Sequence, residues 1–312
     1  MRKSRGGISA ITIGLLFAVG LVPFAPFAGA GAASPKPRPS AAATFPVSVQ
    51  SADGTVDIPS RPDRILSLSA SATQMLYAIG AGSQVVGVDK YSTYPPDAPR
   101  TKFTGYESSA EDYLHLRPDL VIFAFESGTL IQQLRVLHIP ALLLPPATAM
   151  AGVYGQLQEL GKATGHQSGA QKAQSSLASY LSTEAHSVGG AGRGQSYYIE
   201  VDPTYYTATS KTFIGAEFSL FGMQDIADAA GHGSAYPQIS AEYILKENPD
   251  YVFLADSVCC HQTAATFSGR PGFSVLSAVR LHHVIAVNDS VASQWGPHTI
   301  EEFVSILARV LH

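Results

Sequence analysis

Apolar residues occur in short runs of strand length that alternate with amphipathic stretches along most of the chain. In the first half, this pattern predicts strands over residues 64–68, 85–88, 120–124 and 141–144, and helices over residues 73–79 and 130–137. Alternating strands and helices indicate a mostly parallel sheet with helices on both faces. We therefore predict an α/β lobe over residues 61–150.

A long helical stretch follows over residues 153–187, interrupted near Gly165, and the sequence GGAGRG at residues 189–194 then marks a turn. After this turn the alternation resumes, with strands predicted over residues 197–201 and 284–287 and helices over residues 213–221, 275–279 and 300–311. We predict a helical crossover between lobes over residues 151–190 and a second α/β lobe over residues 191–312.

One unit of this pattern occurs twice. Residues 109–124 read SAEDYLHLRPDLVIFA and residues 240–255 read SAEYILKENPDYVFLA, so Ser, Ala, Glu, Leu, Pro, Asp, Val and Ala recur in the same order at an offset of 131. In each copy, a serine begins a helix, a glutamate follows in its first turn, and a proline ends it before an aspartate and a buried strand. These residues are Ser109, Glu111, Pro118 and Asp119 in the first copy, and Ser240, Glu242, Pro249 and Asp250 in the second. Two units this far apart indicate two lobes rather than a solenoid, and we expect a ligand in the cleft between them.

The N-terminus has the features of a secretory signal peptide. Basic residues precede an uncharged apolar run, and small residues offer cleavage sites near residues 30–33. We predict a signal peptide over residues 1–33; the alternative is an uncleaved anchor, because the uncharged stretch is long enough to span a bilayer. No cysteine lies near the cleavage site to accept a lipid. We therefore expect an exported protein, in the periplasm or at the cell surface, that is soluble after cleavage. Residues 34–60 are predicted to form a linker and an N-terminal strand segment.

Charge and motifs argue against two classes of function. The formal net charge is −4, and loss of the three basic residues of the signal would take it to −7, so nucleic-acid binding is not expected. The chain has no G-x-S-x-G, P-loop, G-x-G-x-x-G or H-E-x-x-H motif. We therefore expect no catalytic residues, and an exported α/β hydrolase stays as an alternative without a specific motif.

The stretch RPDRILSLSASATQMLYAIGAGSQVVGVDKYSTYPPDA, residues 61–98, resembles the periplasmic binding proteins that deliver cobalamin and ferric siderophores to ABC importers. The resemblance continues through both repeated units, through YPQISAEYIL at residues 236–245, and into Gly296-Pro297 before the last helix. It implies a class III periplasmic binding protein, an α/β fold of two Rossmann-like lobes joined by a single long helix. It also implies a monomer that captures a ligand between the lobes and passes it to a permease in the cytoplasmic membrane.

The resemblance also implies site residues. The aromatic contacts of the family correspond to Tyr91, Tyr106, Tyr206 and Tyr236, whose rings suit a macrocyclic surface while their hydroxyls hydrogen-bond or ligate iron. An isolated tyrosine in an α/β domain is more often an ordinary core or surface residue. Four tyrosines in loops beside strands and helices favour a ligand site.

The chain departs from the family in one place. The cobalamin-binding branch has an arginine after an aspartate that corresponds to Asp289, and this chain has none between Asp289 and His298. We expect Gln294, Trp295 and His298 to make that contact instead.

The glutamates of the two repeated units have a second implied role. In the family, a glutamate on the outer surface of each lobe pairs with arginines of the permease, and these positions correspond to Glu111 and Glu242. Two carboxylates, one on each lobe, suit charge-assisted docking. The alternative is that both only favour their helix N-termini.

Cys259, Cys260 and His261 are adjacent, after the strand of the second repeated unit. Adjacent cysteines close only a strained ring, so a disulfide and a free pair both stay open. The run is also a candidate soft ligand to haem iron, cobalt or copper, although a complete structural site usually needs four ligands.

Together these features predict the solute-binding component of an ABC importer, whose transported ligand is cobalamin, haem or a ferric siderophore. No prosthetic group is expected. The alternative binding role is a free-standing haem or metal chaperone, for which Glu111 and Glu242 would not matter.

Overall fold

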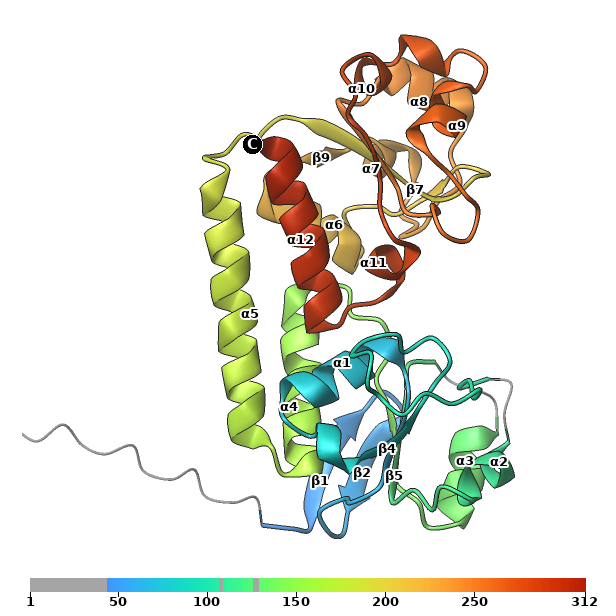
Figure 1. Ribbon diagram of the computed structural model, residues 1–312, viewed down its shortest axis with the longest axis vertical. Coiled ribbons are helices and arrows are strands. Elements are labelled where there is room, and N and C mark those ends of the chain that lie inside the picture. The colour runs from blue at the N-terminus through green and yellow to red at the C-terminus, as the bar shows by residue number, and fades with distance from the viewer. Residues whose placement is uncertain (1–43, 107–108, 126–128) are drawn as a thin grey trace, which may run out of the picture. The chain divides into compact units, whose positions relative to one another are not determined.

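The computed structural model describes residues 44–106, 109–125 and 129–312, and the predicted signal peptide lies outside these ranges (Figure 1). The described residues contain two sheets of mainly parallel strands, one before and one after the long helix α5 (Gln167–Ser187). We call the sheet and helices before α5 the first lobe, and those after it the second lobe. The predicted α/β fold with two lobes is confirmed.

The first sheet has the strand order β4-β3-β5-β6, with every pair parallel. Its strands are β3 (Ile65–Leu68), β4 (Val85–Val88), β5 (Leu120–Phe123) and β6 (Ala141–Leu143). An antiparallel hairpin of β1 (Val47–Ser51) and β2 (Gly54–Ile58) extends the lobe beside β6, where the N–H of Ala52 donates to the carbonyl of Leu143 at 2.9 Å. The helices are α1 (Ala70–Ala78), α2 (Ala110–Leu114), α3 (Leu130–Val136) and α4 (Met150–Thr164), with a 3₁₀ turn η1 (Gly82–Gln84).

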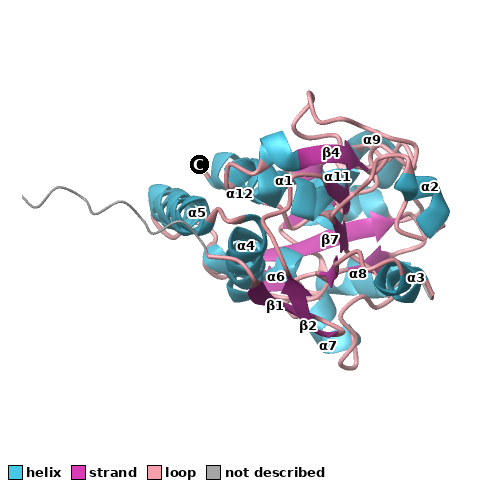
Figure 2. Cartoon of the chain, turned by 90° about the horizontal axis from the view of Figure 1, so that it is seen from below, coloured by secondary structure: helices cyan, strands magenta, loops and turns pink. Residues whose placement is uncertain are grey.

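The second sheet repeats this order as β9-β7-β10-β11, again parallel, and β8 adds an antiparallel strand to β7. Its strands are β7 (Ser196–Asp202), β8 (Tyr206–Thr207), β9 (Gln224–Asp225), β10 (Tyr251–Leu254) and β11 (Val284–Ala286). The helices are α6 (Phe213–Leu220), α7 (Ala227–Ala230), α8 (Ala241–Glu247), α9 (Ala264–Ser268), α10 (Ser277–Arg280), α11 (Asp289–Ser293) and α12 (Pro297–Leu311), with a 3₁₀ turn η2 (Phe273–Val275). Helices lie on both sides of the strands (Figure 2).

The repeated aspartate has the same structural role in both lobes. The carboxylate of Asp119, just before β5, accepts the N–H groups of Asp63 and Arg64 at 2.8 and 2.9 Å. The carboxylate of Asp250, just before β10, accepts the N–H of Ser196 at 2.8 Å. Each aspartate therefore ties the start of one central strand to the start of its neighbour, which sets their parallel register.

The repeated helices begin as predicted but their caps differ. Ser240 accepts the N–H of Tyr243 with its side chain. At the first copy, the N–H and hydroxyl of Ser109 both donate to the carboxylate of Asp112, at 2.7 and 3.0 Å. Asp112, rather than Glu111, is therefore the acidic residue that caps α2, and Glu111 takes no part in the cap.

The predicted helical crossover consists of two antiparallel helices, α4 and α5, and the predicted interruption lies at Gly165. Gly165 has a left-handed φ of +76° and ends α4, and α5 starts two residues later. Helix α4 packs against β1 and α1 of the first lobe, whereas α5 contacts α12. One long helix, α5, therefore leads to the second lobe, and α4 belongs to the first.

Two shorter predictions need correction. The helix predicted over residues 73–79 begins earlier, at Ala70, because the Ser69 hydroxyl accepts the N–H of Ala72 and caps the helix. The helix predicted over residues 275–279 is divided into η2 and α10.

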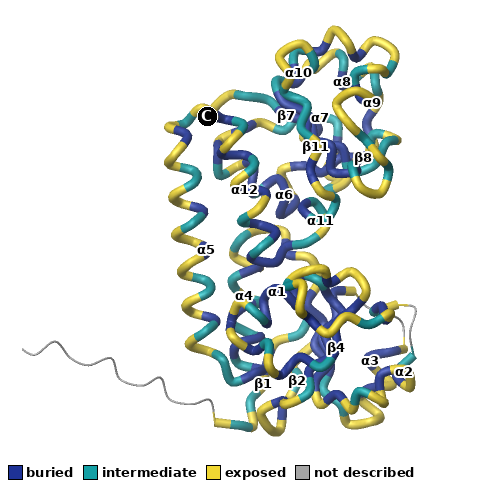
Figure 3. The backbone as a smooth tube through the Cα atoms, in the orientation of Figure 1, coloured by how far each residue is buried: buried dark blue, intermediate teal, exposed yellow. Residues whose placement is uncertain are grey.

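The apolar core is continuous from one lobe to the other on the side of α4, α5 and α12. Its buried members run from Val49 in β1 to Leu311 in α12, and two smaller clusters cover the opposite faces of the two sheets. Strands β3, β5 and β10 are buried along their whole length (Figure 3). Across the part of the chain that the structure describes, no helix has both the length and the apolar character that a membrane crossing requires.

Candidate functional site

A cavity of about 760 Å³, which we call the cleft cavity, lies between residues of the two lobes. From the first lobe it is lined by residues that follow β3, β4 and β5, and from the second by residues that follow β10 and β11. The carboxyl ends of parallel strands are where open α/β sheets bind ligands. The lining residues are Leu68, Ser69, Ala70, Ser71, Asp89, Lys90, Tyr91, Thr93, Gly105, Tyr106, Ala124, Phe125, Val258, Asn288, Asp289, Ser290, Ser293, Gln294 and Trp295.

Exposed aromatic rings line the wall of the first lobe. Tyr91 and Tyr106 are 47% and 57% exposed, and their hydroxyl oxygens lie 2.8 Å apart in a hydrogen bond. Phe125, which follows β5, is 58% exposed. Large aromatic groups left open to solvent at the rim of a cavity are typical of a ligand-binding surface.

The carboxylate of Asp289 faces main-chain donors rather than an arginine. It accepts the N–H of Val258 at 2.8 Å and the N–H of Cys259 at 2.6 Å. These bonds fix the loop after β10 to the start of α11 and satisfy the carboxylate inside the protein. The missing arginine therefore leaves no unpaired acid in the cleft cavity.

Gln294 and Trp295 both line the cavity, but in different ways. The carbonyl oxygen of Gln294 accepts the side-chain N–H of Gln74 at 2.8 Å, and the residue is partly exposed. Trp295 is only 3% exposed, and its indole N–H donates to Gln156 at 2.8 Å. The tryptophan ring is therefore mainly a core group, and Gln294 offers the polar atoms.

The other three predicted contacts lie outside the cavity lining. The imidazole of His298 stacks on Tyr94, with ring centroids 3.5 Å apart and an angle of 9° between the planes. Tyr206 lies on β8 and Tyr236 in a neighbouring loop, and both are nearly half exposed. The N–H of Thr207 donates to the carbonyl of Pro237 at 3.0 Å, so these two tyrosine segments lie side by side in the second lobe. Their role in binding stays a prediction.

Asp89 and Phe125 are among the lining residues that were not predicted from the sequence. Asp89 follows β4, accepts the hydroxyl proton of Ser92 at 2.6 Å, and has its pKa raised by burial. Both follow predicted strands at the edge where the cavity lies. Position at a strand end is therefore the signal that could have identified both.

The Cys-Cys-His run lies in the segment after β10, where the N–H of Cys259 donates to Asp289. Within the described ranges, no three His, Cys, Asp or Glu side chains are placed to hold a metal ion, and the two cysteines form no disulfide. Partial burial of the thiol and the nearby carboxylate of Asp289 raise the pKa of Cys259 well above its usual range. Without a bound metal the thiol of Cys259 is therefore protonated, and its role as a metal ligand stays a prediction.

A buried polar cluster lies at the carboxyl ends of β7 and β10. The guanidinium of Arg270 donates two hydrogen bonds of 2.6 Å to Glu200, whose side chain also accepts the hydroxyl proton of Tyr198. Asp256 is fully buried, and burial together with the charge of Glu200 raises its pKa to about 7. No sequence pattern predicted this cluster, because its members come from three separate segments.

Glu111 and Glu242 are both exposed in the first turns of α2 and α8. Within the described part of the chain, neither forms an ion pair. A hydrogen bond from its own main-chain N–H and another from Ser240 lower the pKa of Glu242. One exposed carboxylate on each lobe is therefore available to a partner.

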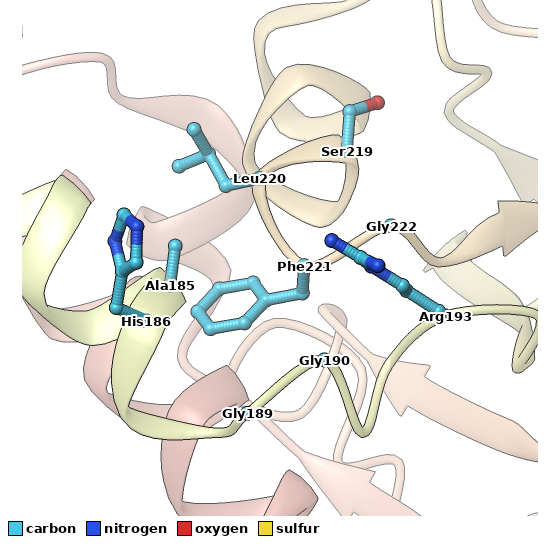
Figure 4. Close-up of a pocket in the computed structure, with 9 residues that line it drawn as sticks. All are labelled: Ala185, His186, Gly189, Gly190, Arg193, Ser219, Leu220, Phe221 and Gly222. Carbon is cyan, nitrogen blue, oxygen red and sulfur yellow. The ribbon is translucent and has the colours of Figure 1, made fainter.

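A second, smaller cavity of about 430 Å³ lies in the second lobe and at the end of α5 (Figure 4). It is bordered by His186, the glycine-rich turn with Arg193, and the end of α6 at Phe221. None of the predicted site residues lines it. The cleft cavity is therefore the candidate ligand site.

Comparison with known proteins identifies the family. A family model described as periplasmic binding protein matches residues 65–291. An uncharacterized ABC transporter substrate-binding lipoprotein of Bacillus subtilis is 31% identical over 268 residues, which cover 82% of this chain and 83% of that protein. A cobalamin-binding protein of Halobacterium salinarum is 31% identical over 289 residues, which cover 88% of this chain and 78% of that protein.

The likeness in structure agrees with the likeness in sequence. The crystal structure of a periplasmic haem-binding protein of Vibrio cholerae superposes with a TM-score of 0.69 at 21% identity, covering 80% of this chain and 98% of that one. At this identity the match establishes the fold alone. The family model spans most of the chain, and two relatives reach 31% identity over most of its length. This chain belongs to the periplasmic binding protein family, whose members bind solutes and are not enzymes.

Proposed function

We propose that this protein binds cobalamin or a closely related corrinoid in the cleft cavity and delivers it to an ABC permease. The observation that carries the proposal is the cleft cavity itself, with the exposed rings of Tyr91, Tyr106 and Phe125 on one wall. Flat aromatic faces pack well against a macrocycle, and the phenol hydroxyls still form hydrogen bonds. The cavity volume lies within the range of about 300–1,000 Å³ that is usual for small-molecule sites.

The choice of corrinoid rests on the relative from Halobacterium salinarum, whose name is cobalamin-binding protein and which matches 88% of this chain. Haem is the second candidate, because a phenol pair such as Tyr91 and Tyr106 offers oxygen atoms to ferric iron. A ferric siderophore stays a third. A fold shared with a haem-binding protein does not choose among these ligands.

Delivery to a permease is supported by the exposed carboxylates of Glu111 and Glu242, one on each lobe. When a permease contacts both carboxylates at once, its binding depends on the positions of both lobes. Export is part of the proposal, because the predicted signal peptide at residues 1–33 would carry the protein out of the cytoplasm. The predicted domain limits and a monomeric state belong to the same proposal.

The experiment is a titration of the purified protein with cyanocobalamin, haemin and a ferric hydroxamate in parallel, followed by quenching of intrinsic fluorescence and by absorption. Saturable binding of cyanocobalamin at micromolar or tighter Kd, with weaker or no binding of the other two, is the expected result. Preferential binding of haemin would identify haem, rather than a corrinoid, as the ligand. Absence of binding by all three would refute the proposed ligand classes.

A further inference from the structure

The segment from Gln294 to Thr299 follows the second sheet in the chain, yet side chains of the first lobe hold it. The main-chain N–H of Trp295 donates to the hydroxyl of Ser71 at 3.0 Å, and the N–H of Thr299 donates to the carbonyl oxygen of Gln74 at 3.1 Å. Ser71 and Gln74 both lie on α1 and are buried. The floor of the cleft cavity is therefore fixed to the first lobe.

Gln74 has only one possible amide orientation. A main-chain N–H donates and never accepts, so the atom of Gln74 that faces the N–H of Thr299 is its carbonyl oxygen. The NH₂ group of Gln74 then faces the other way, where it lies 2.7 Å from the hydroxyl of Thr299 and 2.8 Å from Gln294. Gly296 lies against this amide, and a Cβ at that position would overlap it.

The orientation of Gln74 decides that of Gln294. Because an NH₂ group of Gln74 approaches it, Gln294 must present its own carbonyl oxygen, which leaves its NH₂ group on the other side of the amide. Within the described residues, that NH₂ group donates no hydrogen bond, and Gln294 lines the cleft cavity. Its donors are thus available to a ligand.

We infer that Gln74 is a positioning residue which makes Gln294 a fixed hydrogen-bond donor in the cleft cavity. The partner is an acceptor oxygen at the edge of the ligand, such as a carboxamide carbonyl or a carboxylate. The inference rests on the proposed function only in that the cleft cavity binds the ligand.

The first test is a double-mutant cycle with cyanocobalamin as the probe. In Gln74→Glu, one carboxylate oxygen still accepts a hydrogen bond from Thr299. The other oxygen accepts a hydrogen bond from the NH₂ group of Gln294, so the Gln294 amide takes the opposite orientation. Because one hydrogen-bond donor is lost, the Kd for cyanocobalamin rises about five- to tenfold in Gln74→Glu and in Gln294→Met. The double variant binds cyanocobalamin no more weakly than Gln294→Met alone. The matched control is Gln158→Glu, because Gln158 donates to Gln174 in a similar pair outside the cavity. Gln158→Glu is expected to leave the Kd for cyanocobalamin unchanged.

A purely structural role for Gln74 gives a different result: Gln74→Glu then weakens binding by the same factor with Gln294 present or replaced. That outcome, or unchanged binding in Gln294→Met, overturns the inference. Thermal unfolding of each variant establishes that it is folded.

The second test needs no ligand and uses the unchanged protein. In an NMR spectrum of ¹⁵N-labelled protein, the NH₂ protons of Gln74 exchange slowly with water because they are buried and bonded, whereas those of Gln294 exchange fast. Slow exchange at Gln294 overturns the inference even if cyanocobalamin binds. Fast exchange at Gln294 with no binding of any probe refutes the proposed ligands and leaves the amide orientation supported.

Discussion

The phenol oxygens of Tyr91 and Tyr106 lie 2.8 Å apart, joining the loop after β4 to the segment before α2. This hydrogen bond holds two half-exposed rings as one surface on the first-lobe wall of the cleft cavity. A preorganised aromatic surface limits the entropy that is lost when a ligand binds. Tyr91 and Tyr106 therefore present a fixed aromatic surface to a ligand.

Replacement of Tyr106 with alanine removes a ring from this surface and releases Tyr91. We expect the affinity for cyanocobalamin to fall by about tenfold or more, because one aromatic contact and one hydrogen bond are lost. Tyr106→Phe keeps the ring and is expected to lose less. Tyr206→Ala is the informative comparison, since Tyr206 lies outside the cavity lining. An equal loss in Tyr206→Ala would mean that the ligand reaches the second-lobe loops.

Charge reversal at Glu111 or Glu242 should abolish uptake without changing ligand affinity. Both side chains are exposed and lie outside the cleft cavity, so Glu111→Lys and Glu242→Lys should bind cyanocobalamin with the wild-type Kd. Uptake by cells that lack the wild-type protein measures the transport step. Glu302→Lys, an exposed change on α12, is the control and should transport normally. Normal uptake by both lobe variants would favour a free-standing chaperone.

The salt bridge between Arg270 and Glu200 should be costly to break. Glu200 is fully buried and the side chain of Arg270 is only 13% exposed. Arg270→Met leaves a buried carboxylate without its cation, and we expect the free energy of unfolding to fall by about 3–5 kcal/mol. Arg135→Met breaks an exposed bridge to Asp53 and should cost at most about 1 kcal/mol. Urea unfolding of the two variants measures the difference, and equal losses would contradict it.

Glu217 should make stability depend on pH. Its carboxyl group is fully buried, and neither oxygen has a hydrogen-bond partner among the residues that the structure describes. Burial raises its pKa well above the usual range. The folded state therefore keeps the proton while the unfolded chain loses it above about pH 4.3. The contribution of Glu217 to the free energy of unfolding is fully present below that pH. It is lost by about 1.4 kcal/mol per pH unit as the pH rises towards the folded pKa.

Glu217→Gln removes this ionisation. The free energy of unfolding of the variant minus that of the wild type should therefore increase between pH 5 and pH 8. Asp225 and Asp256, whose pKa values are raised to about 7 chiefly by burial, act in the same direction in both proteins. The difference between the two proteins therefore isolates Glu217. A difference that does not change with pH would show that Glu217 is ionised in the folded state.

Much of the fold was predictable because its signals are local. Apolar runs, caps and helix stops depend on residues a few positions apart, so the main strands of both sheets and the longer helices were predicted with small errors at their ends. The short elements β8, β9, α7, α9 and α11 were not predicted. The capping acid of α2 was the harder detail, since Glu111 and Asp112 both lie in its first turn. Only the side-chain geometry identified Asp112 as the residue that bonds to Ser109.

The candidate site was predictable in part. Tyr91, Tyr106, Asp289 and Gln294 line the cleft cavity, and all four were predicted from the resemblance to the binding-protein family. His298 was expected beside them, but it stacks on Tyr94 and does not line the cavity. Which face a side chain takes after a strand ends depends on what packs around it, and that information is absent from local pattern.

By itself, the sequence determined that the chain contains a duplicated helix and strand unit, two α/β lobes and a long helical connection, because these follow from spacing within a few turns or strands. The tertiary structure decided which groups meet. Gln74 and Gln294 are 220 positions apart, and their 2.8 Å contact exists only because the segment before α12 returns to the first lobe. Hydrogen-bond polarity in the cleft cavity depends on such distant partners, and the fold alone brings them together.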